Sequence, residues 1–143
     1  MKKFGLDKKD KLCSTAAIDM LFSRGGTAYE SGTEPQSVMA YPLRAVWRHN
    51  PGRHSDSQLT FLISIPKKRL HTAVERVLMR RRVREAFRLN RHNYPLRADA
   101  RIDLAFIYIA DKTKNYSDVQ KSVCRILRDI STKSAAARET VVE

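Results

Sequence analysis

The sequence lacks the features that would place it in a membrane or outside the cell. No stretch approaches the roughly 20 continuous apolar residues that a bilayer-spanning helix requires. Residues 1–11 contain no apolar run of the kind that forms the centre of a secretory signal peptide. We therefore expect neither membrane insertion nor secretion, and the cytoplasm is the predicted location.

Cysteine and acidic residues are also scarce. The two cysteines, Cys13 and Cys124, are far apart and have neither metal-ligand spacing nor the density of a disulfide scaffold, so we expect both to be reduced and partly buried. The 15 acidic residues form no carboxylate cluster for two metal ions, and the four histidines are scattered. We therefore expect no catalytic residue, no metal site and no cofactor bound by the protein itself.

Positive charge is what the chain has in excess. It contains 28 Lys and Arg among 143 residues, which gives a formal net charge of +13 at pH 7. Charge of this size on a small chain indicates a polyanionic partner, with nucleic acid favoured over an anionic membrane surface. A hydrophobic content of 42% is enough for one modest core. The sequence therefore predicts one nucleic-acid-binding domain.

Three segments have the periodicity or composition of helices. The longest, Ala73 to about Asn90, contains neither Gly nor Pro and is dense in good helix formers. A shorter helix is predicted at about residues 15–24, with Gly25 beyond its end. The last helix is amphipathic, and Ser117 with Gln120 has the spacing of a capping box at its start.

Strands are predicted between these helices. Residues 38–47 and 59–65 are rich in β-favouring types, and a third short strand is suggested near residues 27–30. Residues 101–110 are almost continuously apolar, as in a central strand covered on both faces. The order α-β-β-β-α-β-α predicts an α+β fold, a single two-layer sandwich in which helices cover the sheet.

The two ends of the chain differ from its middle. Residues 1–11 are basic and aperiodic, which predicts a flexible arm able to lie on phosphates. Residues 131–143 are polar without an apolar stripe, which predicts a disordered tail. The folded domain is therefore expected to span residues 12–130.

The charge is concentrated between Lys67 and Arg91, where ten basic residues face two acidic ones and supply +8 of the net charge. On a helix, four arginines spaced by four residues form one column, beside Arg81 and next to an apolar stripe. The column is Arg76, Arg80, Arg84 and Arg88, and the stripe is Met79, Val83, Ala86 and Phe87. Arginines in a column repel one another, and a polyphosphate relieves that repulsion. Because arginine also matches phosphate oxygens and stacks on unpaired bases, we expect RNA as the partner.

The order of residues in this window resembles the signature of the ribonuclease P protein component family. In that signature a strand ending in Lys-Lys leads into a helix reading Arg-Asn-Arg-x-Lys-Arg-x-x-Arg-Glu-x-Phe-Arg. Here Lys67-Lys68 ends the strand, and the helix has the matching residues Arg76, Arg80, Arg81, Arg84, Glu85, Phe87 and Arg88. Val77 and Leu78 stand where the family has Asn and the second Arg, and Arg82 adds a basic residue nearby. The resemblance extends over roughly residues 10–130.

The resemblance implies a left-handed crossover between two strands, and it implies a function. Such a protein is a ribonuclease P holoenzyme subunit that binds the catalytic RNA and the 5′ leader of precursor tRNA. It promotes endonucleolytic removal of the leader, so that the mature tRNA 5′ end forms. Catalysis is then carried by the RNA partner, which requires Mg²⁺, and no membrane or protein partner is implied.

Two sets of binding residues follow from the same resemblance by position. The RNA-binding set is Lys67, Lys68, Arg69, Arg76, Arg80, Arg81, Arg84 and Arg88. The leader-cleft set is Phe22, Ile18 and Tyr41, in which an aromatic ring would stack on an unpaired base. Phe22, at helical spacing, is equally typical of a core residue.

One alternative function stays open on the residues alone. A structural RNA-binding protein of ribosomal-protein type would share the charge and the arginine-rich helix, but it would not depend on a leader cleft. Composition does not separate the two, whereas the ordered signature from Lys67 to Arg88 favours the ribonuclease P subunit.

Overall fold

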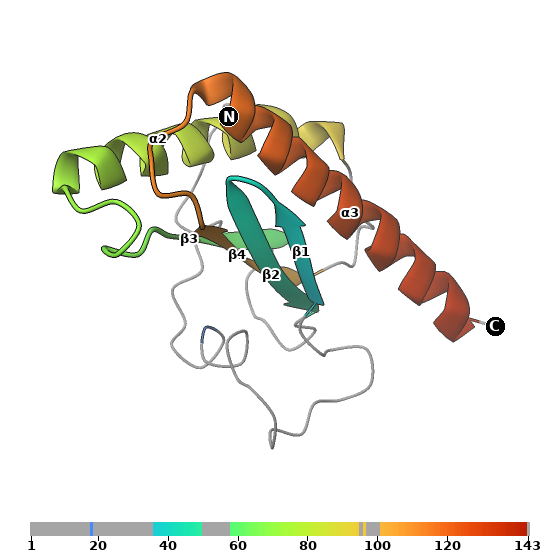
Figure 1. The fold of residues 1–143 in the computed structure, drawn as a ribbon. Coiled ribbons are helices and arrows are strands. Elements are labelled where there is room, and N and C mark those ends of the chain that lie inside the picture. Colours follow the sequence, from blue (N-terminus) through green and yellow to red (C-terminus); the bar gives the residue numbers. More distant parts are fainter. Residues whose placement is uncertain (1–17, 19–35, 50–57, 95, 97–100, 143) are drawn as a thin grey trace, which may run out of the picture.

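A computed structural model describes residues 18, 36–49, 58–94, 96 and 101–142 of the chain, and side chains only as far as residue 133. Within these residues a four-stranded sheet carries two long helices (Figure 1). The strands are β1 (Gln36–Ala40), β2 (Leu43–His49), β3 (Leu59–Ser64) and β4 (Ile102–Tyr108). The helices are α2 (Ala73–Asn90) and α3 (Tyr116–Val142), with a short 3-10 helix η2 (Arg91–Asn93) after α2.

The sheet is mixed, with the strand order β1-β2-β4-β3. The pairs β1–β2 and β2–β4 are antiparallel, whereas β3 and β4 are parallel neighbours joined through α2. The predicted α+β class and element order are confirmed, and so is the interior position of β4. The left-handed sense of the β3-α2-β4 crossover stays a prediction.

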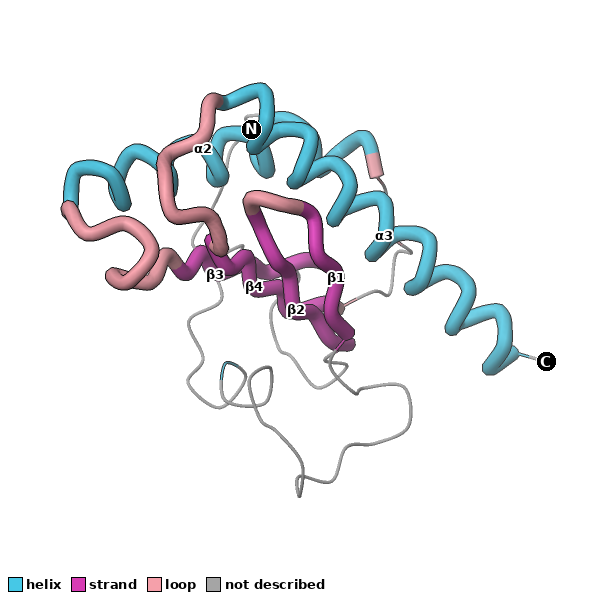
Figure 2. Tube along the Cα trace, in the orientation of Figure 1, coloured by secondary structure: helices cyan, strands magenta, loops and turns pink. Residues whose placement is uncertain are grey.

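The main core lies between the sheet and the two helices, which cover the same face (Figure 2). Helix α3 packs over β1 and β2, whereas α2 packs over β3 and against α3. Alternate residues of each strand point into this core because side chains of a strand alternate between faces. In β4 these residues are Ile102, Leu104, Phe106 and Tyr108, all fully buried.

The opposite face of the sheet is partly polar but still covered. Asp103 and Thr60 are buried there on neighbouring strands, and the Thr60 hydroxyl donates to the Asp103 carboxylate at 2.8 Å. Ile18, the one described residue of the predicted first helix, is helical and packs against the small apolar cluster of Val46 and Ala105. The rest of that helix, Phe22 included, the third strand suggested near residues 27–30, and Cys13 lie outside the described residues. Cys124 is a free thiol and half-buried, as predicted.

Several sequence-based predictions about element boundaries are wrong. Residues 38–47 are not one strand but the two strands of a hairpin, which turns at Tyr41 and Pro42. Pro42 has no backbone N–H to donate, so a strand cannot run through it in the interior of a sheet. Ser117 does not cap the last helix. The cap is Asn115, two residues before Ser117, whose side-chain oxygen accepts the Asp118 backbone N–H at 2.9 Å.

The C-terminal helix is also longer than the apolar stripe predicts. Its buried apolar residues are those expected, Val119, Val123, Ile126, Leu127 and Ile130. Where the sequence predicts a disordered tail from residue 131, helical backbone continues to Val142. The run of three alanines at 135–137 favours helix, and extending an existing helix avoids the cost of nucleating a new one.

Candidate nucleic-acid interface

Helix α2 is held in one orientation by its cap and by its apolar stripe. The Thr72 hydroxyl accepts the Glu75 backbone N–H at 3.2 Å and donates to the Glu75 carboxylate at 2.7 Å, which fixes the first turn. Further along, the predicted stripe is fully buried, and Phe87 lies with its ring centroid 4.6 Å from that of Phe61 and 5.8 Å from that of Phe106. The basic side of α2 therefore turns away from the core.

The predicted column of four arginines divides into residues held by the protein and residues that are not. At one end, the Arg76 guanidinium donates to the backbone carbonyls of Leu70 and His71 at 2.9 and 3.1 Å. These bonds tie the first turns of α2 to the segment before it. Arg76 is consequently half-buried and its guanidinium is occupied by backbone oxygens.

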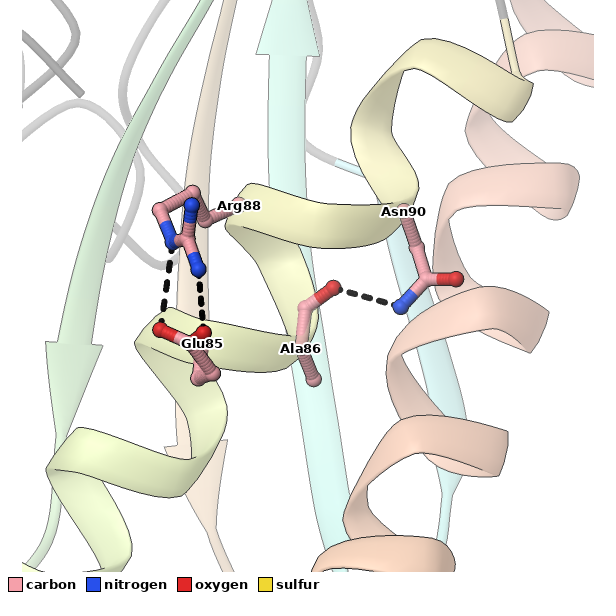
Figure 3. A network of polar contacts seen from close by, with 4 residues as sticks. All are labelled: Glu85, Ala86, Arg88 and Asn90. Atoms are coloured by element: carbon pink, nitrogen blue, oxygen red, sulfur yellow. Dashed lines mark hydrogen bonds and ion pairs between the residues drawn. The ribbon is translucent and has the colours of Figure 1, made fainter. Parts of the chain in front are cut away.

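At the other end of the column, Arg88 forms an ion pair with Glu85 one turn earlier on α2 (Figure 3). The bond from Arg88 holds the pKa of the Glu85 carboxyl below its ordinary value, and the same bond raises the pKa of Arg88. Figure 3 also shows Asn90 donating back to the Ala86 carbonyl at 2.8 Å, which ends the helix with a side-chain contact. The charge of Arg88 is therefore partly neutralised within the helix.

The middle of α2 carries the arginines that the fold leaves unpaired. Arg81 and Arg84 are exposed and Arg80 is half-buried, and within the described part of the chain none of the three has a side-chain or backbone partner. Lys67 and Lys68 do not end the strand as predicted, because β3 ends at Ser64 and both lysines lie in the turn that follows it. Both are exposed and likewise have no partner among the described residues. These five cations can donate hydrogen bonds to phosphate oxygens without first breaking a bond inside the protein.

Two further basic residues bind the loop that joins β4 to α3. Arg69 forms a salt bridge with Asp111 at 3.0 Å, and the Arg82 guanidinium donates to the Lys114 carbonyl. These contacts bring residues 111–114 against the turn before α2 and against the middle of the helix. The sequence analysis missed them because the partners are 42 and 32 residues apart, and no local spacing signals such a pair.

The predicted leader-cleft residues occupy different places. Phe22 lies outside the described residues, and Ile18 contacts the sheet face opposite α2 and α3. Tyr41 lies in the β1–β2 turn and is 61% exposed, and the Lys114 ammonium stands 5.3 Å from the centroid of its ring. The cleft itself stays a prediction.

No group of three or more His, Cys, Asp and Glu in the described part of the chain is arranged to hold a metal ion. No helix among the described residues is both long enough and apolar enough to cross a bilayer.

Comparison with known proteins places this geometry in context. The profile of the family described as "Ribonuclease P" matches residues 6–131, most of the chain. Two curated relatives, from two strains of Porphyromonas gingivalis, are each 31% identical over 138 residues, which covers 92% of this chain and 93% of the relative. Both relatives are named ribonuclease P protein component.

Proposed function

The chain belongs to the ribonuclease P protein family, and from that premise we propose that it binds the catalytic RNA of ribonuclease P and the 5′ leader of precursor tRNA. In this role it promotes the endonucleolytic cut that removes the leader and forms the mature 5′ end of the tRNA. The RNA partner carries out the cleavage and holds the Mg²⁺ ions that the reaction requires.

The observation that carries the proposal is the set of five unpaired cations in the turn after β3 and on the middle of α2. Lys67, Lys68, Arg80, Arg81 and Arg84 come from adjacent segments of chain and have no acidic partner among the described residues. Arginine and lysine in this state bind phosphates at little cost, because the only charge to displace is a counterion. An RNA backbone supplies phosphates in the required number.

The other basic residues of the predicted RNA-binding set have a second role in the proposal. Arg76 and Arg69 hold the segment between β3 and α2 through backbone carbonyls and through Asp111. They therefore fix the place of Lys67 and Lys68 relative to the helix. Arg88 remains available to phosphate only if it leaves Glu85.

Leader binding is the second half of the proposal and involves residues away from α2. Phe22, Ile18 and Tyr41 are the proposed contacts, and of these Tyr41 offers an exposed ring on which an unpaired base can stack. The Lys114 ammonium beside that ring is placed to meet the phosphate of the same nucleotide. No side chain of the protein takes part in the hydrolysis in this proposal.

A reconstitution with three components tests the proposal. The purified chain, the ribonuclease P RNA transcribed from the same genome and a precursor tRNA with a short leader are mixed with Mg²⁺. Cleavage at the tRNA 5′ end is expected when both chain and RNA are present, and none is expected from the chain alone. Cleavage by rigorously RNA-free protein, or absence of binding to this RNA with binding to ribosomal RNA instead, would overturn the proposal.

A further inference from the structure

The outermost line of α2 is not the arginine column that the sequence suggests. The residues 74, 77, 81, 84 and 88 are spaced by three and four in alternation, so they follow one another along a single helix face. The buried residues Met79, Val83 and Ala86 occupy the opposite face. The line that faces solvent therefore begins with two valines and continues with arginines.

The two valines are unusually open for apolar residues of a helix. Val74 is 79% exposed and Val77 is 53% exposed, and they are two of only five large apolar side chains that the described residues expose. Nothing in the fold requires them to be apolar, since neither belongs to the core. The two side chains are therefore available for a contact outside the chain.

The positive charge around the two valines favours a negatively charged partner. Arg81 and Arg84 continue the same line and have no partner within the described residues. The two acids of α2 are already occupied, because Glu75 bonds to Thr72 and Glu85 pairs with Arg88. The positive end of the helix dipole also lies at the turn that contains Val74. A partner that presents apolar surface beside negative charge fits this line, and a nucleotide has both.

The spacing along α2 matches one nucleotide contact beside a phosphate contact. With a rise of 1.5 Å per residue, Val77 lies about 6 Å along the helix axis from Arg81, and Val74 about 10.5 Å. A phosphate held by Arg81 therefore has its own ribose or base within reach of Val77. Unpaired bases pack well on exposed apolar side chains because their faces are poorly hydrated and carry no charge.

We propose that Val74 and Val77 form an apolar contact for an unpaired nucleotide of the RNA whose phosphates bind Arg81 and Arg84. This inference rests on the proposed function and adds the chemistry of recognition at the start of α2. Helix α2 then makes two kinds of RNA contact: its first half packs on a base or ribose, and its second half binds phosphate.

The test compares salt dependence in two double variants of the full chain. Binding to the transcribed ribonuclease P RNA is measured over a series of KCl concentrations. V74S/V77S is expected to bind about tenfold more weakly at every concentration with an unchanged log–log slope, because apolar contact is lost and no ion is released. R81A/R84A is expected to lower both the affinity and the slope. Serine and valine have similar helix propensities, so the helix itself is little affected.

Two controls keep the result interpretable. L89S removes an apolar side chain that is 37% exposed near the other end of α2, and it should bind RNA as the wild type does. V74T/V77T keeps the branched shape and should give a smaller loss than the serine pair. Equal thermal stability of the variants shows that folding is not the cause.

The outcomes separate this inference from the function on which it rests. If the wild type fails to bind the RNA, the proposed function fails. If the wild type binds and V74S/V77S binds equally well, only the apolar contact is refuted. The nucleotide contact would also be refuted if the wild type self-associates and V74S/V77S does not, with unchanged RNA affinity. The valines would then form a contact between two copies of the chain. A base-modifying reagent should reveal an unpaired nucleotide that the wild type protects and V74S/V77S does not.

Discussion

The R80A/R84A double variant tests whether the middle of α2 is the phosphate-binding surface. Both side chains lie on one side of α2, one turn apart, and neither has a partner among the described residues. Removing them breaks no hydrogen bond or ion pair among the described residues, so the free energy of unfolding should change little. A loss of RNA affinity then reports on the interface and not on the fold.

The size of the effect follows from the number of contacts removed. Each phosphate contact contributes about 0.7 to 0.9 to the slope of log affinity against log salt, so two lost contacts reduce the slope by about 1.4 to 1.8. Hydrogen bonds to charged groups contribute about 1.5 to 3 kcal/mol each, so the affinity at low salt should fall about a hundredfold or more. Filter binding or fluorescence titration at several KCl concentrations measures both quantities.

The matched control removes the same charge from another helix. Arg125 and Arg128 are exposed on α3, and R125A/R128A lowers the net charge by the same two units. If the binding surface is local to α2, this variant keeps nearly the wild-type slope. Equal losses in both double variants would show that net charge and not the geometry of α2 governs binding, and the reasoning would be refuted.

Three further predictions concern other parts of the chain. The E85Q variant should break the ion pair of Arg88 and raise the salt slope of RNA binding by somewhat under one unit. Because the pair lowers the pKa of Glu85, the stabilising effect of the pair is present above the ordinary glutamate pKa and disappears as the pH falls through the lowered value. The pH-dependent unfolding of E85Q should lack this component. The F87A variant should lose about 3 to 5 kcal/mol of unfolding free energy in denaturant titration, because a ring between two other rings is removed from the core. The F22A variant, at matched stability, should weaken holoenzyme binding of precursor tRNA and leave mature tRNA unaffected, whereas equal weakening of both in a binding assay would make Phe22 an ordinary core residue.

The elements that the sequence predicted well are those whose pattern is local. Helix α2 begins and ends where composition indicated, because good helix formers fill it and Thr72 precedes it. Its buried stripe was predicted by the 3.6-residue period alone. The interior position of β4 followed from its continuous apolar run, since a strand covered on both faces has no polar alternation.

The errors concern competing local signals and distant contacts. The hairpin at Tyr41–Pro42 was missed because apolar residues continue across the turn, although Pro42 was visible as a break. Asn115 caps α3 in place of Ser117, and both are good capping residues, so only the start of the backbone helix decides between them. The pairing of Arg69 with Asp111 joins residues 42 positions apart, and no periodicity reports it.

The sequence could not predict which arginines of the α2 column already form bonds inside the protein, and this is the difference with the largest consequence for RNA binding. Spacing makes Arg76, Arg80, Arg84 and Arg88 equivalent, yet backbone carbonyls hold the first and Glu85 holds the last. An arginine bonded inside the protein has to break that bond to meet a phosphate, whereas an unpaired one only releases its counterion. The held arginines fix the two ends of the helix surface, and the unpaired ones between them keep the freedom to follow an irregular RNA backbone. Affinity should therefore be most sensitive to the middle of α2, and stability to its ends.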